Sequence, residues 1–149
     1  MSVPYDIFVG AFLEKITEYE LSFLATDDRD EIVHGYMKRS IAGFKKNCKY
    51  NLVSSRVDEL GEFNVDIPSD DLDEIVDIVS EGMVVQWLKP YVYKQELLEN
   101  TINTRDFTTY SPAELLMRIG NAYEKAQKDY TQMIREYSYN NGDLSDLHL

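Results

Sequence analysis

Apolar residues recur every three to four positions along most of the chain, a spacing typical of amphipathic α-helices. The first such segment covers residues 5–24, with Phe8, Phe12 and Ile16 on one face. Pro4 is expected in the first helical turn, where its missing N–H needs no partner. The same spacing predicts a second helix over residues 32–48. Residues 50–68 lack a sustained period and predict a loop, in which the alternation over 63–67 indicates one short extended piece.

Two more helices are predicted in the second half of the chain. Residues 69–88 are apolar around most of the circumference, so this third helix is expected to be covered on most sides. Pro90 is expected to end or kink it, with a short helical segment over 91–99. Ser111 and Glu114 form a capping box with Pro112 at the first helical position, which predicts a long final helix. The sequence therefore predicts an all-α domain over residues 1–138, a bundle of about four helices with a Pro-broken third helix, and a flexible polar tail over 139–149.

The composition fits one folded domain and restricts its partners. The chain has 149 residues, of which 44% are hydrophobic, enough for a single core. It carries 27 acidic and 15 basic residues, a net charge of -12, which disfavours gripping nucleic acids or anionic membranes. One cysteine, Cys48, excludes an internal disulfide. No apolar run is long enough for a transmembrane helix.

The negative charge is concentrated in one window. Ten acidic residues and no Lys or Arg lie between residues 57 and 88, whereas the rest of the chain holds 17 acidic and 15 basic residues. Directly upstream, residues 32–56 contain six basic residues and no acidic one. Two interpretations are open: two solvated helix faces, or patches by which one copy meets the next in a heterologous contact that generates rings or filaments. The residues assigned to this self-association are Lys38, Arg39, Lys45, Lys46, Lys49, Asp70, Asp71, Asp73, Glu74 and Asp77.

The sequence lacks the signatures of catalysis. Neither of the Gly-rich loops that hold phosphates in nucleotide-binding proteins is present. Cys48 lies 14 residues after His34, about 21 Å along one helix, which is too far for a Cys–His pair. The carboxylates at 70–77 share a helical face, but they are more typical of a solvated first turn than of a metal site. We expect no enzyme activity, metal or cofactor.

Three tyrosines on the final helix are spaced by seven residues: Tyr123, Tyr130 and Tyr137. Such a heptad fits a helix that lies in a groove or packs against a neighbouring copy. An ordinary core edge, with the hydroxyl groups reaching water, is the alternative. Because tyrosine is enriched in protein–protein contacts, we assign these residues to a helix-face interface.

Several short motifs carry a family resemblance. They are Ser40-Ile41-Ala42-x-Phe44-Lys45-x-x-Cys48, Phe63-Asn64-Val65-Asp66, Met83-Val84-Val85-Gln86-Trp87-Leu88-Lys89-Pro90, Glu96-Leu97-Leu98 and Arg105-Asp106-Phe107-Thr108-Thr109-Tyr110-Ser111-Pro112-Ala113. Through these motifs, residues 1–138 resemble the head–tail connectors (neck or adaptor proteins) of phages that infect Gram-positive bacteria. The motifs are not catalytic ones.

The resemblance implies a virion structural protein made in the host cytoplasm and located at the head–tail junction. Its subunits are expected to form a homo-oligomeric ring, of which a dodecamer is one expected form. The other expected partners are the portal protein and a tail-side neck or tail-completion protein. DNA is expected to pass through the ring without specific binding, because an acidic lumen repels phosphates. The acids assigned to the channel or to the next ring are Asp58, Glu59, Glu62 and Asp66.

The tail and a second function class complete the expectations. Leu144, Leu147 and Leu149 are expected to anchor the tail on the portal or on a tail-side ring, and a tail that stays disordered is the alternative. The alternative function is a small acidic, host-directed phage protein that binds and sequesters a basic protein partner. The particle size in solution separates these two functions.

Overall fold

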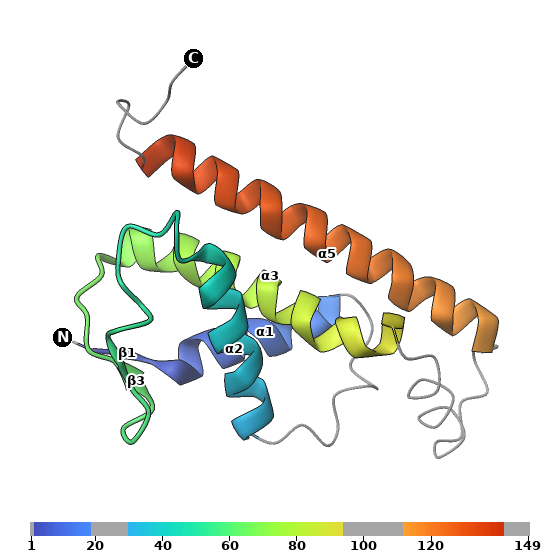
Figure 1. The fold of residues 1–149 in the computed structure, drawn as a ribbon, viewed down its shortest axis with the longest axis horizontal. Helices are drawn as coiled ribbons and strands as arrows, with labels where there is room; N and C mark the ends of the chain where they lie inside the picture. The colour runs from blue at the N-terminus through green and yellow to red at the C-terminus, as the bar shows by residue number, and fades with distance from the viewer. Residues whose placement is uncertain (1, 19–29, 94–111, 142–149) are drawn as a thin grey trace.

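The computed structural model describes residues 2–18, 30–93 and 112–141. Within these ranges it contains four helices and three two-residue strands (Figure 1). The helices are α1 (Tyr5–Glu18), α2 (Asp30–Phe44), α3 (Ser69–Tyr93) and α5 (Pro112–Asn141), and the strands are β1 (Val3–Pro4), β2 (Arg56–Val57) and β3 (Glu62–Phe63). The prediction of a helical bundle with a long C-terminal helix is confirmed.

Helix α3 lies at the centre of the bundle and contacts the other three helices. Its second half is buried on nearly every side, from Ile78 to Leu88, as the apolar circumference predicts. Helix α5 runs alongside α3 in the opposite direction, while α2 crosses α3 at a steep angle (Figure 1). Aromatic rings fill the spaces between the helices: Phe12 packs edge-on against Trp87 at 6.0 Å, and Phe44 against Tyr137 at 5.0 Å. Helices α1, α2 and α5 therefore pack around α3, and the hydrophobic core lies between them.

A close approach of three helices fixes their relative positions. The Ser40 hydroxyl on α2 donates to the Val79 carbonyl on α3 at 2.7 Å. The Tyr130 hydroxyl on α5 donates to the Ser40 carbonyl at 2.5 Å. Gly82 of α3 lies directly against both side chains. A residue without a Cβ is required there, because any side chain would overlap Ser40.

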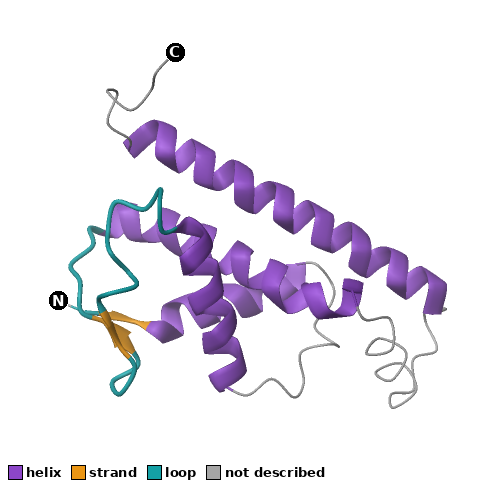
Figure 2. Cartoon of the chain, in the orientation of Figure 1, coloured by secondary structure: helices purple, strands orange, loops and turns teal. Residues whose placement is uncertain are grey.

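A small antiparallel sheet packs at one end of the helices (Figure 2). Its strand order is β1-β3-β2, with Phe63 of the central strand opposite both Val3 and Arg56. The Phe63 ring is buried 4.8 Å from that of Tyr5. Only one extended piece was predicted here, because strands of two residues leave too short an alternation to detect.

Several predicted helix boundaries need correction, among them the end of the final helix, which lies at Asn141, three residues into the predicted tail. Pro4 lies in the edge strand β1 rather than in the first helical turn, which suits a residue without an N–H. Helix α2 ends at Phe44, and the Cys48 N–H closes a turn on the Phe44 carbonyl. Helix α3 continues through Pro90 to Tyr93, so Pro90 does not end the helix, which was one of the two expected outcomes. Proline removes only one backbone hydrogen bond, and the tertiary contacts of α3 outweigh that loss near its end. Residues 19–24, 94–99 and 111 lie outside the described ranges.

Candidate interaction surfaces

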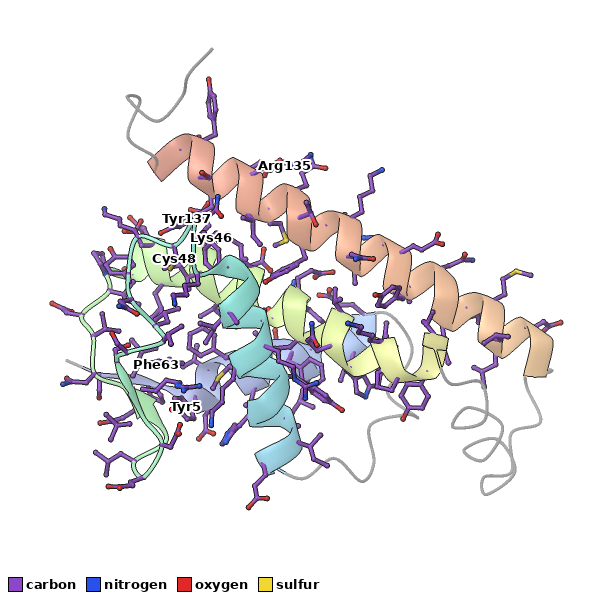
Figure 3. All side chains as sticks on the ribbon, in the orientation of Figure 1. Tyr5, Lys46, Cys48, Phe63, Arg135 and Tyr137 are labelled. Carbon is purple, nitrogen blue, oxygen red and sulfur yellow. The ribbon has the colours of Figure 1, made fainter. Side chains whose placement is uncertain are left out.

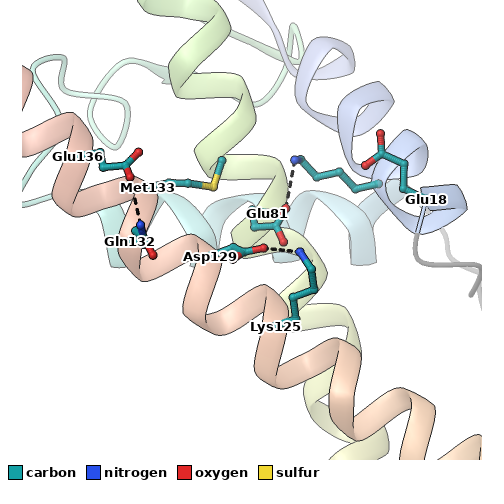
Figure 4. Close-up of a pocket in the computed structure, with 8 residues that line it drawn as sticks. Glu18, Glu81, Lys125, Asp129, Gln132, Met133 and Glu136 are labelled. Carbon is teal, nitrogen blue, oxygen red and sulfur yellow. Dashed lines mark hydrogen bonds and ion pairs between the residues drawn. The ribbon is translucent and has the colours of Figure 1, made fainter.

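An acid-rich groove runs between α1, α3 and α5. It consists of one hollow of about 510 Å³ between the three helices (Figure 4) and an adjoining one of about 450 Å³ between α1 and α3. Both hollows are lined by Lys15 and Glu18. The charged residues of this acidic groove are Glu14, Lys15, Glu18, Asp73, Glu74, Asp77, Glu81, Lys125, Asp129 and Glu136. Eight carboxylates and two ammonium groups leave it strongly negative.

Lys15 neutralises the floor of the acidic groove. Its Nζ atom lies 2.7 Å from Asp77 Oδ1 and 3.1 Å from Glu81 Oε2. Burial by itself lowers the pKa of Lys15, but the hydrogen bonds to Asp77 and Glu81 outweigh it and raise the pKa above its ordinary value. Glu81 is only 5% exposed, and its ion pair with Lys15 offsets part of the cost of burying a carboxylate. Lys125 pairs with Asp129 at 2.6 Å on the α5 side.

The basic residues predicted for self-association gather on and just after α2, but several have partners within the chain. Lys38 Nζ lies 3.3 Å from Asp58 Oδ2, and Arg39 stacks over the Tyr36 ring. Lys49 Nζ is 3.9 Å from Asp71 Oδ2. Among the described residues, Lys45 and Lys46 at the end of α2 are exposed and form no ion pair.

The acidic residues predicted for self-association lie on the first half of α3. Asp71 accepts a hydrogen bond from the Tyr50 hydroxyl at 2.7 Å, and Asp77 pairs with Lys15. Asp70 and Asp73 are exposed, and Glu74 is half-buried. The opposite charges along the sequence are thus partly matched inside one chain. Pairing of the remaining charges between copies stays a prediction.

The acids predicted to face a channel or a second ring lie on or beside the β2–β3 hairpin. Asp58 accepts a hydrogen bond from the Tyr5 hydroxyl at 2.6 Å. This bond, together with the one from Lys38, lowers the pKa of Asp58 below its ordinary value. Glu59 and Asp66 are exposed, whereas Glu62 in β3 is half-buried. Their role in a channel or between rings stays a prediction.

A smaller pocket opens at the C-terminal end of α2. It has a volume of about 240 Å³, and the loop over 48–53 closes one side. Its apolar lining consists of Ile41, Phe44, Leu52 and Val53, and its rim carries Lys45 and Lys49. Cys48 also lines this pocket, and burial raises the pKa of its thiol. The thiolate is the nucleophilic form of cysteine, so this shift disfavours a nucleophilic role for Cys48.

The heptad tyrosines face the interior of their own chain. Tyr137 is fully buried and its hydroxyl accepts a hydrogen bond from the Lys49 N–H at 3.2 Å. Tyr130 donates to the Ser40 carbonyl, and Tyr123 is 8% exposed. The heptad thus marks the face by which α5 packs on α2 and α3. Contact of this face with a neighbouring copy would require α5 to leave that position.

The sequence analysis missed two features of these surfaces. One is the α1 and α5 contribution to the acidic groove, from Glu14, Glu18, Asp129 and Glu136, since these acids lie among basic residues in the sequence. The other is Leu60, which is 70% exposed at the hairpin tip. The sequence signal for this exposed residue is a single leucine that follows two acidic residues and precedes a glycine. The predicted tail anchors Leu144, Leu147 and Leu149 lie outside the described residues.

Comparisons with known proteins add no family to this description. No family model, curated protein or solved structure matches the chain. In the part of the chain that the structure describes, no three His, Cys, Asp or Glu side chains are grouped to hold a metal ion. None of the helices described there has the length and apolar character to cross a membrane.

Proposed function

We propose that this chain is a structural subunit of a phage virion, a head–tail connector that assembles into a ring between the portal and the tail. The observation that carries the proposal is the presence of different, oppositely charged surfaces on one chain. The acidic groove lies between α1, α3 and α5, and the basic pocket rim lies at the end of α2. Two unlike but complementary surfaces support head-to-tail contacts, which close into rings when the rotation fits.

The charge distribution also suits a ring that surrounds DNA. The acids proposed to face the channel, on or beside the β2–β3 hairpin, are Asp58, Glu59, Glu62 and Asp66, and carboxylates repel DNA phosphates. A channel of that character lets DNA pass without holding it. The portal protein and a tail-side completion protein are the proposed neighbours, at the head–tail junction of the virion. The resemblance of the motifs at 40–48 and 83–90 to those of connectors supports this class of function over others.

The alternative is a small acidic phage protein that sequesters a basic host protein. The same acidic groove supports it, because eight carboxylates against two ammonium groups attract a basic partner. The two functions differ in stoichiometry. A connector assembles with many copies of itself, whereas a sequestering protein binds its target as a single copy.

Mass photometry and negative-stain electron microscopy of the purified chain, alone and mixed with its portal, test the proposal. We expect ring-shaped particles of one discrete size with a central channel. Double reversal of charge at the α2 end, Lys45→Glu with Lys46→Glu, should reduce ring formation. The matched control is Lys128→Glu with Arg135→Glu on the exposed face of α5. A chain that stays monomeric with and without portal contradicts the proposal.

A further inference from the structure

The two hollows of the acidic groove differ in how far their charges are matched. In the hollow between α1, α3 and α5, Lys15 pairs with Glu81 at 3.1 Å and Lys125 pairs with Asp129 at 2.6 Å. The other hollow, of about 450 Å³ between α1 and α3, is called the α1–α3 hollow below. Four of its carboxylates form no ion pair with any residue of the described ranges: Glu14, Glu18, Asp73 and Glu74.

These unmatched carboxylates repel one another in the isolated chain. Glu14 and Glu18 lie four residues apart on α1, a spacing at which like charges destabilise a helix. Asp73 and Glu74 line the hollow from α3. Lys15 also lines it, but its ammonium group is already held by carboxylates of α3. A cation that enters the α1–α3 hollow would therefore relieve a repulsion that the isolated chain retains.

The end of α2 carries positive charge that is not matched within the described part of the chain. Lys45 and Lys46 directly follow Phe44, where α2 ends, and both are exposed. Neither forms an ion pair with a described residue. In Figure 3, Lys46 marks this end of the helix. The two lysines are called the basic end of α2 below.

Helix α2 and the α1–α3 hollow lie on opposite faces of α3. Ser40 of α2 donates to the Val79 carbonyl and lies against Gly82, whereas Asp77 lines the hollow and pairs with Lys15 of α1. At about 3.6 residues per turn, Asp77 and Val79 point in nearly opposite directions. Figure 4 looks into the adjoining hollow, and there α2 passes behind α3. The two surfaces of one copy are therefore free to meet two different neighbours.

We propose that the basic end of α2 of one copy docks in the α1–α3 hollow of the next copy, where Lys45 and Lys46 pair with the unmatched carboxylates. Charge complementarity supports a second copy as the occupant. Because the two surfaces lie on opposite faces, neighbours are related by a small rotation, and a closed ring then holds many copies. The contact rests on the proposed function, for which it supplies the subunit interface, and it selects one of the two hollows of the acidic groove.

Two variants that each lose this contact should restore it when they are mixed. The α2-end variant, Lys45→Glu with Lys46→Glu, places carboxylates opposite the acidic hollow of the next copy. The hollow variant, Glu14→Lys with Glu18→Lys and Asp73→Lys, places ammonium groups opposite the lysines of the next copy. Sedimentation velocity at low salt should show the association constant of each variant alone reduced at least about 100-fold from that of the wild-type chain. In an equal mixture, alternating copies bring opposite charges together, and association should return to within about tenfold of wild type.

A matched control carries the same change of charge beside the neighbouring hollow. It is Glu124→Lys with Asp129→Lys and Glu136→Lys, all on α5. This control should associate with itself like the wild-type chain and should not rescue the α2-end variant. Circular dichroism checks that each variant is folded. Equal rescue by the hollow variant and the control would show attraction by net charge alone and overturn the inference, as would an absence of rescue.

Cross-linking of the wild-type chain tests the same contact without any substitution. A mixture of unlabelled and ¹⁵N-labelled chains is treated with a carbodiimide, which joins a lysine to a carboxylate only where the two are in contact. Mass spectrometry should find mixed-isotope amide links from Lys45 or Lys46 to the carboxylates of the α1–α3 hollow. Links from these lysines to Asp129 or Glu136 instead, or no mixed-isotope link, overturn the inference.

These outcomes separate the inference from the proposed function. Rings of the wild-type chain without the expected cross-links refute this contact and leave the connector function standing. Cross-links and mutual rescue between chains that form no closed ring, alone or on the portal, support the contact and refute the connector function.

Discussion

Replacing Gly82 by alanine should destabilise the fold, although alanine has a higher helix propensity than glycine. An added Cβ would overlap the Ser40 hydroxyl and would lie 2.6 Å from Tyr130 Cε1 and 2.9 Å from Ser40 Cβ. Carbon atoms in contact are normally separated by roughly 3.5–4.0 Å, so the neighbours must move by about 1 Å. Neither can move freely, because Ser40 donates to Val79 and Tyr130 donates to Ser40.

The net effect follows from three contributions. Overpacking of a filled core costs about 1–3 kcal/mol, and losing one of the two hydrogen bonds at Ser40 costs about 1 kcal/mol. Exchanging a helical glycine for alanine recovers about 1 kcal/mol. We therefore expect Gly82→Ala to lower the free energy of unfolding by about 1–3 kcal/mol. For a chain of this length, a loss of about 2 kcal/mol lowers the melting temperature by about 4–8 °C.

Urea unfolding followed by circular dichroism measures this difference, and Gly120→Ala is the matched control. A Cβ at Gly120 in α5 meets no atom within 4 Å, so only the helix-propensity gain remains. That variant should gain roughly 0.5–1 kcal/mol. The two glycine replacements should thus change the free energy of unfolding in opposite directions. A Gly82→Ala variant as stable as the wild-type chain would refute the close packing of α2, α3 and α5.

Three further predictions concern charges and hydroxyl groups. Lys15→Met removes the ammonium group 3.1 Å from buried Glu81 and should cost about 1–3 kcal/mol in urea unfolding. Adding Glu81→Gln should recover part of this loss, and additive effects of the two substitutions would contradict the coupling. Tyr130→Phe removes the donor to the Ser40 carbonyl and should cost about 1 kcal/mol, whereas Tyr139→Phe, at a residue 72% exposed, should cost nothing measurable. Burial raises the pKa of Tyr137 from 10.0 to about 12, so the folded state holds this proton more tightly than the unfolded state. The contribution of Tyr137 to the free energy of unfolding should then be constant below pH 10 and fall as the pH rises from 10 to about 12. Tyr137→Phe should make that fall shallower, and an unchanged pH profile would contradict the assignment.

The charged surfaces were predictable from the sequence only in part. The acidic window over 57–88 indicated where negative charge accumulates, because composition is a local property. The ion pairs Lys38–Asp58 and Lys15–Asp77 join residues 20 and 62 positions apart. No spacing rule along a helix reaches that far, so the partial neutralisation within the chain could not be read from the sequence. The acidic groove and the pocket exist only once α1, α3 and α5, or α2 and its following loop, are side by side.

The sequence by itself determined the helices of this protein, because the three-to-four residue period and the proline at residue 112 act within a few turns of chain. Tertiary structure decided the rest. Long-range packing kept α3 helical through Pro90, because contacts along its length outweigh one missing hydrogen bond. It also turned the Tyr123, Tyr130 and Tyr137 face inward, and it paired two-residue strands into a hairpin that carries Leu60. Which apolar residues are covered depends on which distant elements arrive beside them, and that is fixed only by the fold.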